Sequence, residues 1–312
     1  MSAPPGRSTP SRARSSQGPG IADPFLLVNP RSGDQSPTSA ELIEEATRRG
    51  IEARELTGED DARTRASDAA DRGAPALGMA GGDGSLGAVV EVAMERDLPF
   101  VCIPFGTRNH FARDLGLDRD DPIAALDAFT GSERQVDMGE VNGRLFLNNV
   151  SLGVYAGFVH DPTRKTRNRL LALIRMAPAM LGRGRRPLAL ALEAEGMRTE
   201  RNALVVLVAN NDYRMTTMAD LGVRSRLDGG LLHAYLIEAV DRRGLLALLA
   251  RAVRGRAETA EGWAEWAATS IRVEFGHNRI HAAIDGEPVV LEPPLEFAIR
   301  QRGLRILVPA SA

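Results

Sequence analysis

Three short polar loops, each directly following an apolar run, hold the residues of this chain best suited to chemistry. The loops are Asn29–Gly33, Gly81–Gly87 and Pro104–Arg113. Glycines let the backbone approach an anion closely, and hydroxyl groups such as those of Ser85 and Thr107 add hydrogen-bond donors. Because ligands gather at the carboxyl ends of strands in an α/β sheet, these loops predict a phosphate-binding cleft and a nucleotide-using enzyme.

Each loop also has a purely structural interpretation. Gly81–Gly84 is typical of a tight turn between a strand and a helix, and Asn29–Gly33 suits a plain strand-to-helix turn. Thr107 and Asn109 suit the cap of a following helix. Three coincident loops nevertheless favour a shared cleft. Asp83 would repel a phosphate there, so we expect it to bind Mg²⁺, directly or through water, or to orient the loop.

Two further turns carry carboxylates. Asp285-Gly286-Glu287 lies between two apparent strands, and Asp-Gly is a common hairpin signal. In the functional interpretation, one of its carboxylates accepts a hydroxyl proton while the other holds a metal or the base in position. Asp228-Gly229-Gly230 is similarly either a turn or a cation site formed by Asp228 and neighbouring carbonyls. The five histidines lack metal-binding spacing, and we interpret them as structural or surface residues.

The composition narrows the chemistry further. The chain has 312 residues, 43% hydrophobic and 26% charged, which is ordinary for a globular protein with a substantial core. Its net charge of −2 gives no overall attraction to nucleic acid. Cys102 is the only cysteine, lies in an apolar strand and fits a reducing compartment. Lys165 is the only lysine, so a phosphoryl transfer must rest on backbone amides, hydroxyls, arginine and metal.

The elements that position these loops change in type near Asp137. Before it, strands and helices alternate, which predicts a parallel sheet with helices on both faces. The expected strands are 24–29, 51–56, 76–80 and 99–103, and the expected helices are 38–49, 60–72 and 85–95. After it, short alternating segments such as 135–141, 144–150, 188–195, 202–209, 231–239, 271–275, 279–284, 288–291 and 295–299 predict an antiparallel β-rich domain.

The fold class expected from this pattern is α/β followed by β. We expect an N-terminal parallel α/β nucleotide-binding domain and a C-terminal antiparallel β-rich domain. The expected boundaries are a disordered tail at 1–22, the first domain at 23–137, the second at 138–303, and a last strand at 304–312 that the pattern assigns to neither domain.

Two expected helices, Thr163–Leu181 and Asp241–Arg254, interrupt the β-rich half. Arg164–Arg186 carries eight basic side chains and no acidic one. The plain interpretation is an amphipathic helix that covers a sheet with solvated arginines. The functional interpretation is that this segment docks peripherally on an anionic membrane surface. Since no run approaches the length of a membrane span and the N-terminus has no hydrophobic signal, we expect a cytoplasmic protein, with peripheral contact at the inner face of the membrane.

In order along the chain, these motifs resemble those of the diacylglycerol kinase catalytic family, including its bacterial lipid-kinase branch, which is related to sphingosine kinases. The resemblance covers roughly Phe25 to Pro309. It rests on Asn-Pro-x-Ser-Gly at 29–33, Gly-Gly-Asp-Gly-Ser-Leu at 81–86, Pro-x-Gly-Thr-x-Asn-x-Phe-Ala at 104–112, Phe-x-Asn at 146–148 with Ser-x-Gly at 151–153, Asp-Gly at 228–229 and Asp-Gly-Glu at 285–287. Many relatives have threonine in place of Ser85. Tyr213–Met218 stands where the family often has a glycine-rich loop.

The resemblance implies a site between the two domains. It implies catalysis by Asp285 and Glu287, with Asp83 near the phosphates. It implies ATP binding by Asn29, Pro30, Arg31, Ser32, Gly33, Thr57, Gly81, Gly82, Asp83, Gly84, Ser85, Leu86, Gly87, Thr107 and Asn109. It also implies a cation site at Asp228 with carbonyls of Ser225 and Gly230.

The sequence thus predicts an ATP- and Mg²⁺-dependent lipid kinase. Two alternatives stay open: a soluble phosphotransferase similar to NAD kinases, and a catalytically silent, membrane-associated regulatory protein. The acceptor among diacylglycerol, sphingoid bases, phosphatidylglycerol and prenyl alcohols is open, as is a homodimer. No nucleic-acid partner is expected.

Overall fold

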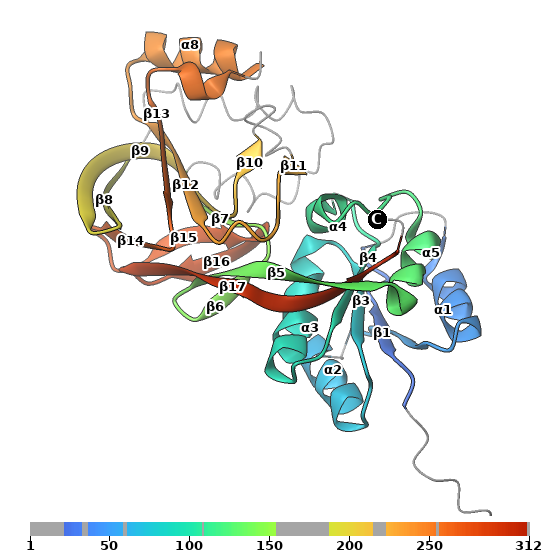
Figure 1. Cartoon of the computed structure of the whole chain (residues 1–312). Coiled ribbons are helices and arrows are strands. Elements are labelled where there is room, and N and C mark those ends of the chain that lie inside the picture. Colours follow the sequence, from blue (N-terminus) through green and yellow to red (C-terminus); the bar gives the residue numbers. More distant parts are fainter. Residues whose placement is uncertain are drawn as a thin grey trace, which may run out of the picture.

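The computed structural model describes residues 22–32, 37–58, 61–107, 109–153, 187–214, 223–253 and 256–310. Figure 1 shows two parts, an α/β lobe built from the N-terminal half and a β lobe built from the C-terminal half. Two long strands, β5 (Ser132–Val141) and β17 (Leu295–Val308), run from one lobe into the other. The expected fold class, α/β followed by β, is confirmed.

The α/β lobe is built on a parallel sheet in which three strands are buried and the edge strand, β2, is mostly polar. Its order is β2-β1-β3-β4, and all four predicted strands are present. The strands are β1 (Phe25–Val28), β2 (Glu52–Glu55), β3 (Leu77–Gly81) and β4 (Phe100–Pro104). β1, β3 and β4 are buried along their whole length, as expected for strands covered on both faces.

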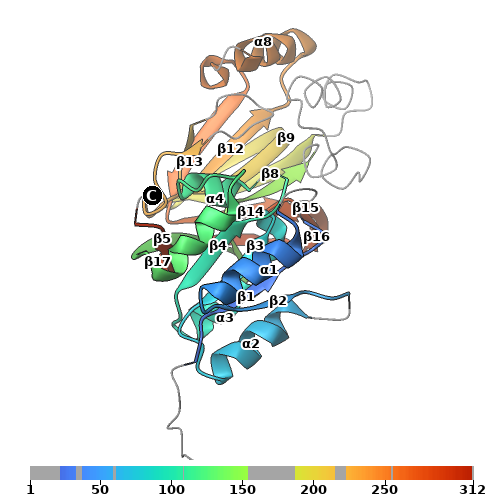
Figure 2. The same ribbon diagram turned by 90° about the vertical axis from the view of Figure 1, so that its right-hand side faces the viewer.

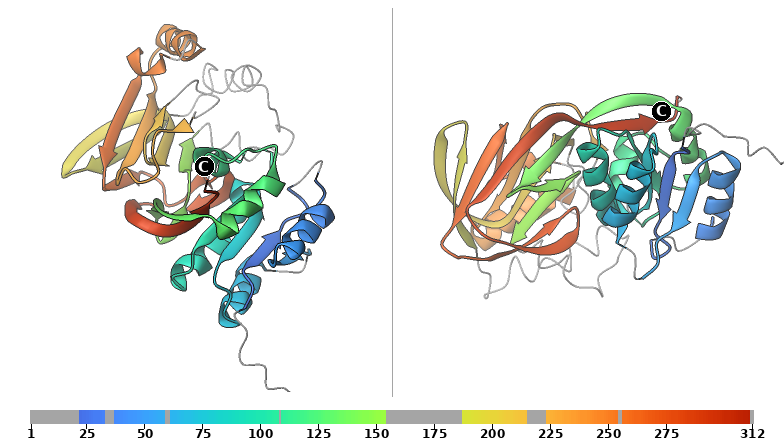
Figure 3. Two further views of the ribbon diagram at one scale, coloured as in Figure 1. Left: turned by 45° about the vertical axis from the view of Figure 1, so that its right-hand side comes forward. Right: turned by 90° about the horizontal axis from the view of Figure 1, so that it is seen from below.

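Helices cover both faces of this sheet, as Figure 3 shows from below. On one face lie α2 (Ala62–Asp71), α3 (Asp83–Glu95) and α4 (His110–Asp114), which share a core with Phe25, Leu77 and Met79. On the other lie α1 (Ser39–Arg48), α5 (Pro122–Ala125) and the 3-10 turn η1 (Leu126–Thr130), which share a core with Leu26 and Val28. Figure 2 shows α1 and α2 apart, with strands between them.

Helix α3 begins two residues earlier than the sequence pattern predicts. Gly82 is its N-cap, with extended backbone angles, and Asp83 is its first residue. A carboxylate in the first turn interacts favourably with the positive end of the helix dipole. The apolar spacing starts only at Leu86, so the hydrophobic pattern could not mark this first turn.

The β lobe is antiparallel throughout the described residues. Its strands are β6 (Arg144–Phe146), β7 (Asn149–Gly153), β8 (Leu188–Ala194), β9 (Met197–Asn210), β10 (Tyr213–Arg214), β11 (Val223–Arg224), β12 (Leu232–Glu238), β13 (Trp263–Ala268), β14 (Ser270–Phe275), β15 (Ile280–Ile284) and β16 (Glu287–Leu291). The predicted strand 144–150 is divided into β6 and β7, because the chain leaves the sheet at Leu147 and Asn148. Strand β13 was not predicted.

Strand β17 decides where the C-terminal segment belongs. The sequence predicts separate strands at 295–299 and 304–308, but the structure has one strand that pairs antiparallel with β5. The register shifts between Arg300 and Leu304, and the end of β17 pairs parallel with β4 through Ile306 and Leu307. The last strand therefore completes the sheet of the α/β lobe. The domain boundaries themselves remain a prediction.

Helix α8 (Arg242–Val253) lies at the far end of the β lobe (Figure 1). Leu245 and Leu248 are buried against Leu204 and Ile237, whereas Leu246 is 54% exposed. This part of the chain fits the plain interpretation of an amphipathic helix on a sheet. Within the described residues, no helix is both long and apolar enough to span a membrane. The predicted helix Thr163–Leu181 and the basic segment Arg164–Arg186 lie outside the described residues, as does nearly all of the predicted tail.

Candidate nucleotide and catalytic site

The first two glycine-bearing loops meet at the carboxyl ends of β1 and β3. Asn29 follows β1, and its side-chain Nδ2 donates to Ser85 Oγ in the first turn of α3 at 3.0 Å. Ser32 Oγ lies 3.5 Å from the same hydroxyl. Asn29 Oδ1 also accepts from the backbone N–H of Arg31 at 3.0 Å, which closes its own turn. These contacts bring two hydroxyl groups and the start of α3 together.

The second and third loops touch through two glycines. A Cβ atom on Gly106 would overlap Gly82 Cα and lie 2.8 Å from its nitrogen, so only glycine fits there. Asn109 is buried and left-handed (φ 48°). Its Oδ1 accepts from Gly106 N at 3.0 Å, and its Nδ2 donates to Gly106 O at 2.7 Å. Asn109 therefore closes its own loop rather than capping α4 with its side chain, and Thr107 beside it is exposed.

Asp83 orients a neighbouring helix. Its two carboxylate oxygens accept from the backbone N–H groups of His110 at 3.0 Å and Phe111 at 2.9 Å, the first residues of α4. The side chain of Asn148, from the β lobe, donates to Asp83 Oδ1 at 3.3 Å. Both roles expected for Asp83, binding Mg²⁺ and orienting the loop, remain predictions.

The acidic turn, Asp285-Gly286-Glu287, is a hairpin turn that lies next to these loops. Asp285 and Gly286 have positive φ angles of 49° and 87° and connect β15 to β16. The Asp285 carboxylate accepts three backbone N–H groups, from Leu147 at 2.8 Å, Asn148 at 2.7 Å and Asn149 at 3.1 Å. Asp285 thus ties the turn to the segment between β6 and β7.

The charge of Asp285 is subject to opposing influences. Burial raises the pKa of its carboxyl group to about 6, the three backbone donors oppose the rise, and the nearby Asp83 carboxylate adds to it. A carboxyl group with this pKa changes its protonation near physiological pH.

Glu287 places the acidic turn against the loop Gly81–Gly87 of the α/β lobe, called the glycine loop below. A Cβ atom on Gly84 would overlap Glu287 Oε1 and lie 2.6 Å from its Cγ. Gly84 and Glu287 are both exposed. The two carboxylates of the turn are therefore placed differently: Asp285 is held by amides, and Glu287 lies open beside the first turn of α3.

The remaining residues predicted to bind the nucleotide surround these loops. The Arg31 side chain lies near Gly58, where a Cβ atom would be 3.1 Å from Arg31 Nη2, and this places the loop of Thr57 beside the first loop. Leu86 is buried in the core, so it could meet a ligand only through its backbone. A Cβ atom on Gly87 would meet nothing within 4 Å. Pro30 is half-buried, and Gly33 lies outside the described residues.

The loop of the predicted cation site is engaged in protein contacts. Asp228 is exposed, and its Oδ1 accepts from Arg226 Nε at 2.9 Å, a hydrogen bond that lowers the pKa of the carboxyl group. The Gly230 carbonyl accepts from Gln301 Nε2 at 3.1 Å. Ser225 is exposed. The role of Asp228, Ser225 and Gly230 as cation ligands remains a prediction.

With this geometry in view, comparisons with known proteins identify the relatives of the chain. Residues 23–141 match the family profile described as diacylglycerol kinase catalytic domain. Residues 159–308 match that described as YegS C-terminal NAD kinase beta sandwich-like domain. The chain belongs to the diacylglycerol kinase catalytic family.

Similar proteins match two thirds or nearly all of the length of this family member. A diacylglycerol kinase of Bacillus subtilis (strain 168) is 25% identical over 91% of this chain and 95% of its own. A diacylglycerol kinase of Mycobacterium tuberculosis (strain H37Rv) is 32% identical over 66% of each chain. The crystal structure of a candidate diacylglycerol kinase from Bacillus anthracis str. Sterne superposes with a TM-score of 0.74 at 19% identity, covering 94% of this chain and 99% of its own. At that identity the likeness concerns the fold alone.

Three residues at the junction of the lobes were not predicted to take part in the site. They are Asn148, which appeared only within a family motif, and the pair Asp114 and Arg224, whose side chains are completely buried. A buried arginine in a two-residue strand has no local sequence signal. The position of Arg224 at the junction of the lobes becomes visible only from its contacts in the structure.

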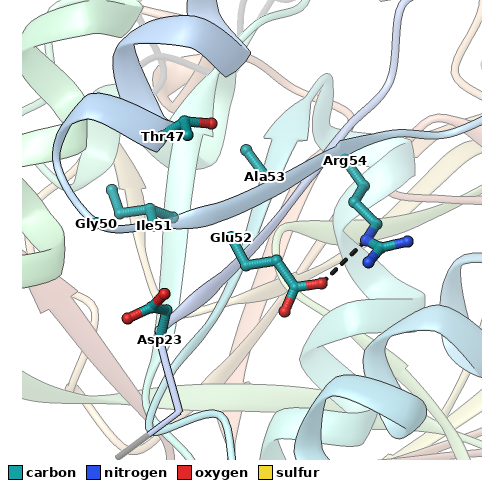
Figure 4. Close-up of a pocket in the computed structure, with 7 residues that line it drawn as sticks. All are labelled: Asp23, Thr47, Gly50, Ile51, Glu52, Ala53 and Arg54. Carbon is teal, nitrogen blue, oxygen red and sulfur yellow. Dashed lines mark hydrogen bonds and ion pairs between the residues drawn. The ribbon is translucent and has the colours of Figure 1, made fainter.

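Two hollows in the described part of the chain lie away from these loops. Figure 4 shows a shallow one lined by Asp23, Glu52, Arg54 and their neighbours, with Arg54 Nε bonded to Glu52 Oε1 at 2.9 Å. It lies beside β2 and just before β1, on the side of the sheet where these strands begin. The glycine-bearing loops are at the opposite, carboxyl ends, where ligands of such sheets bind. This hollow is therefore not part of the candidate site.

Proposed function

We propose that this protein transfers the γ-phosphate of ATP to the hydroxyl group of a lipid. The observation that carries the proposal is the position of Glu287 directly over Gly84. It puts the acidic turn of one lobe against the glycine loop of the other, where a phosphate and an attacking hydroxyl would have to meet.

The α/β lobe supplies the phosphate site in this proposal. The backbone amides of Gly81–Ser85 and the amino end of the 13-residue helix α3 offer a positive potential without a lysine. Thr107 and Ser85 add hydroxyl donors near them. These preorganised groups would stabilise charge on the transferring phosphoryl group.

The acidic turn supplies proton transfer. Glu287 is exposed and accepts the proton of the lipid hydroxyl, whereas Asp285, fixed by three amides, holds the turn in place. The reverse assignment, with Asp285 as the proton acceptor, is the alternative, and its raised pKa would suit that task. Replacing each carboxylate separately distinguishes the two.

Mg²⁺ is the cation we propose to accompany ATP, since oxygen ligands suit it and its charge offsets that of the phosphates when it is bound. Asp228 and the carbonyls of Ser225 and Gly230 are the proposed ligands of a further cation. Because Arg226 already pairs with Asp228, an ion there would require this pair to rearrange. No step of the reaction depends on that site.

We also propose that the protein acts from the cytoplasm on the inner face of the membrane, where its acceptor lies. The membrane contact would be formed by the exposed side chains of α8, which are Leu246, Arg242, Arg243 and Arg251, together with Arg164–Arg186.

Two rival functions remain. The description of the second family profile supports one rival, a kinase that phosphorylates NAD. A silent regulatory protein is the other rival.

The deciding experiment offers the purified protein radiolabelled ATP and a panel of acceptors. The panel holds diacylglycerol, sphingosine, phosphatidylglycerol and a prenyl alcohol in mixed micelles, and NAD in solution. We expect phosphate in one lipid and none in NAD. Labelled NAD with unlabelled lipids would replace the proposal by the NAD rival. ATP binding without transfer to any acceptor would favour the silent protein.

The first prediction concerns site variants in that assay. Gly82→Asp, which adds a like charge beside the phosphates, should abolish lipid phosphorylation. Glu287→Gln, which removes the proposed proton acceptor, should lower kcat by about 10²–10⁴-fold, and Asp285→Asn, which only loosens the turn, should lower it less. Circular dichroism checks that the variants fold. Arg198→Gln, which removes an exposed ion pair with Glu274, is the matched control and should keep activity. Near-normal turnover of Gly82→Asp or of both carboxylate variants would contradict the assigned roles.

A further inference from the structure

One buried side chain connects both halves of the candidate site. Arg224, in β11, is buried to 4% exposure and pairs through Nε with Asp114 Oδ2, at the end of α4, at 2.7 Å. Its backbone N–H also donates to Asp114 Oδ1 at 3.3 Å. Because α4 belongs to the α/β lobe and β11 to the β lobe, this ion pair crosses the junction of the lobes.

The other nitrogens of the Arg224 guanidinium reach the segment that holds the acidic turn. Nη1 donates to the carbonyl of Leu147 at 2.6 Å and to that of Asn210 at 3.2 Å. Nη2 donates to the side-chain Oδ1 of Asn148 at 2.9 Å. The rings of Phe111 and Tyr213 lie 5.7 and 5.5 Å from its central carbon. These hydrogen bonds and the two aromatic rings together fix the orientation of the guanidinium.

Asn148 connects Arg224 with two carboxylates of the candidate site, those of Asp83 and Asp285. Its Oδ1 faces Arg224, so its Nδ2 faces the α/β lobe and donates to Asp83 at 3.3 Å. Its backbone N–H donates to Asp285 at 2.7 Å, between the amides of Leu147 and Asn149 that bind the same carboxylate. One residue thus touches the carboxylates of both the glycine loop and the acidic turn.

We propose that Arg224 is a positioning residue for phosphoryl transfer: it fixes Leu147–Asn149 and thereby aligns the acidic turn with the glycine loop. Arg224 would act through these residues and would not touch the substrate. The inference rests on the proposed function, because the alignment matters only if a phosphate and a hydroxyl react between the two turns. The planar guanidinium has five N–H donors and binds four acceptors at once, which a lysine ammonium cannot do.

The test compares variants that keep or remove the buried charges. Arg224→Lys keeps a positive charge beside Asp114 but loses the fork. Asp114→Asn combined with Arg224→Met removes both charges, so neither is left buried and unpaired. Arg198→Met, at an exposed arginine that also pairs with a carboxylate, is the matched control.

We expect Arg224→Lys to lower kcat by about tenfold or more, with the KM for ATP within about threefold of wild type, because alignment is lost while the phosphate site remains. The double variant should behave likewise, and Arg198→Met should resemble wild type. If the double variant does not fold, Arg224→Lys alone decides. A folded Arg224→Lys with the kcat of wild type would overturn the proposal.

Amide hydrogen exchange supplies a readout that does not depend on activity. In Arg224→Lys the amides of Leu147, Asn148 and Asn149 should exchange about tenfold faster, while those of β1 and β3 keep their wild-type rates. Exchange that rises evenly over the molecule would show general destabilisation and would overturn the positioning role. If wild type phosphorylates no lipid, the proposed function fails, and the exchange pattern by itself decides whether Arg224 positions this segment.

Discussion

The carboxyl group of Asp285 has an unusual environment for a hairpin residue. Asp-Gly turns normally expose their aspartate, yet this carboxylate is turned inward to three backbone amides and lies near Asp83. The amides favour the charged form, but burial and the neighbouring carboxylate outweigh them and raise the pKa to about 6. The group is therefore poised to change its charge in a range that activity and stability measurements can reach.

The second prediction follows from this pKa. In the unfolded chain the Asp285 carboxyl has its ordinary pKa of 3.8, and in the folded protein the pKa is about 6. Between these values the folded state binds a proton that the unfolded state does not, so this group stabilises the fold as pH falls from about 6 towards about 4 and loses that effect as pH rises. Asp285→Asn should lack this contribution.

The measurement is the free energy of unfolding by urea at several pH values for both proteins. The difference between wild type and Asp285→Asn should shift in favour of wild type as the pH falls from 7 to 5. Asp127→Asn, at an exposed carboxylate, controls for the general effect of pH. A difference that stays constant over this range would show that the pKa of Asp285 is not raised.

The third prediction uses the contact between Gly84 and Glu287. Alanine suits a helix better than glycine by about 1 kcal/mol, so Gly84→Ala should not destabilise α3. Its Cβ atom would nevertheless overlap the Glu287 side chain and displace that carboxylate from the loop. We expect unchanged or raised thermal stability together with a kcat at least about tenfold lower.

Gly87→Ala is the stability control, because it lies on the same helix and its Cβ atom would meet nothing within 4 Å. Differential scanning calorimetry and the lipid assay check the two effects separately. A Gly84→Ala variant with wild-type turnover would mean that the position of the Glu287 side chain beside this loop is not needed for the reaction.

At the level of elements, local sequence patterns predicted much of the fold. Apolar runs marked β1, β3 and β4, and the end of each run marked a loop of the candidate site. These signals work because a strand buried on both faces must be apolar along its length and a loop that approaches another backbone must be glycine, as Gly106 against Gly82 illustrates.

The contacts between distant elements could not be predicted in this way. The bond from Arg302 N to Asp137 spans 165 positions, and that from Arg224 Nη2 to Asn148 spans 76. Local periodicity carries no information about such partners. For the same reason the sequence suggested that Asp83 binds Mg²⁺ or orients its loop, while its bonds to α4 and Asn148 became visible only in the structure.

At the level of the whole molecule, the two lobes are joined by a two-stranded ribbon rather than by a single linker. β5 and β17 pair from Phe297 with Val141, in the β lobe, to Val308 with Ser132, in the α/β lobe. The one shift in this register falls where the ribbon passes between the lobes, and Arg302 has a positive φ of 51° there. The relative position of the two halves of the site therefore depends on this irregularity.

Asp137 holds the irregularity in place. It is 1% exposed, and its carboxylate accepts from the backbone N–H of Arg302 at 2.8 Å and from that of Gly230 at 2.7 Å. One side chain thus connects the bulge of β17 with the loop of Asp228. Its own backbone N–H donates to Leu227 O at 2.7 Å, which fixes the other end of that loop.

The fourth prediction is that Asp137→Ala weakens both stability and activity. Two backbone donors lose a charged acceptor, which should lower the free energy of unfolding by about 2–4 kcal/mol. Urea denaturation measures that loss, and Asp127→Ala, at an exposed ion pair with Arg49, should cause little change. Since the bulge sets how the lobes meet, kcat of the remaining folded protein should also fall, with ATP binding less affected. A stable Asp137→Ala protein with full turnover would show that the ribbon does not need this carboxylate to align the two halves of the site.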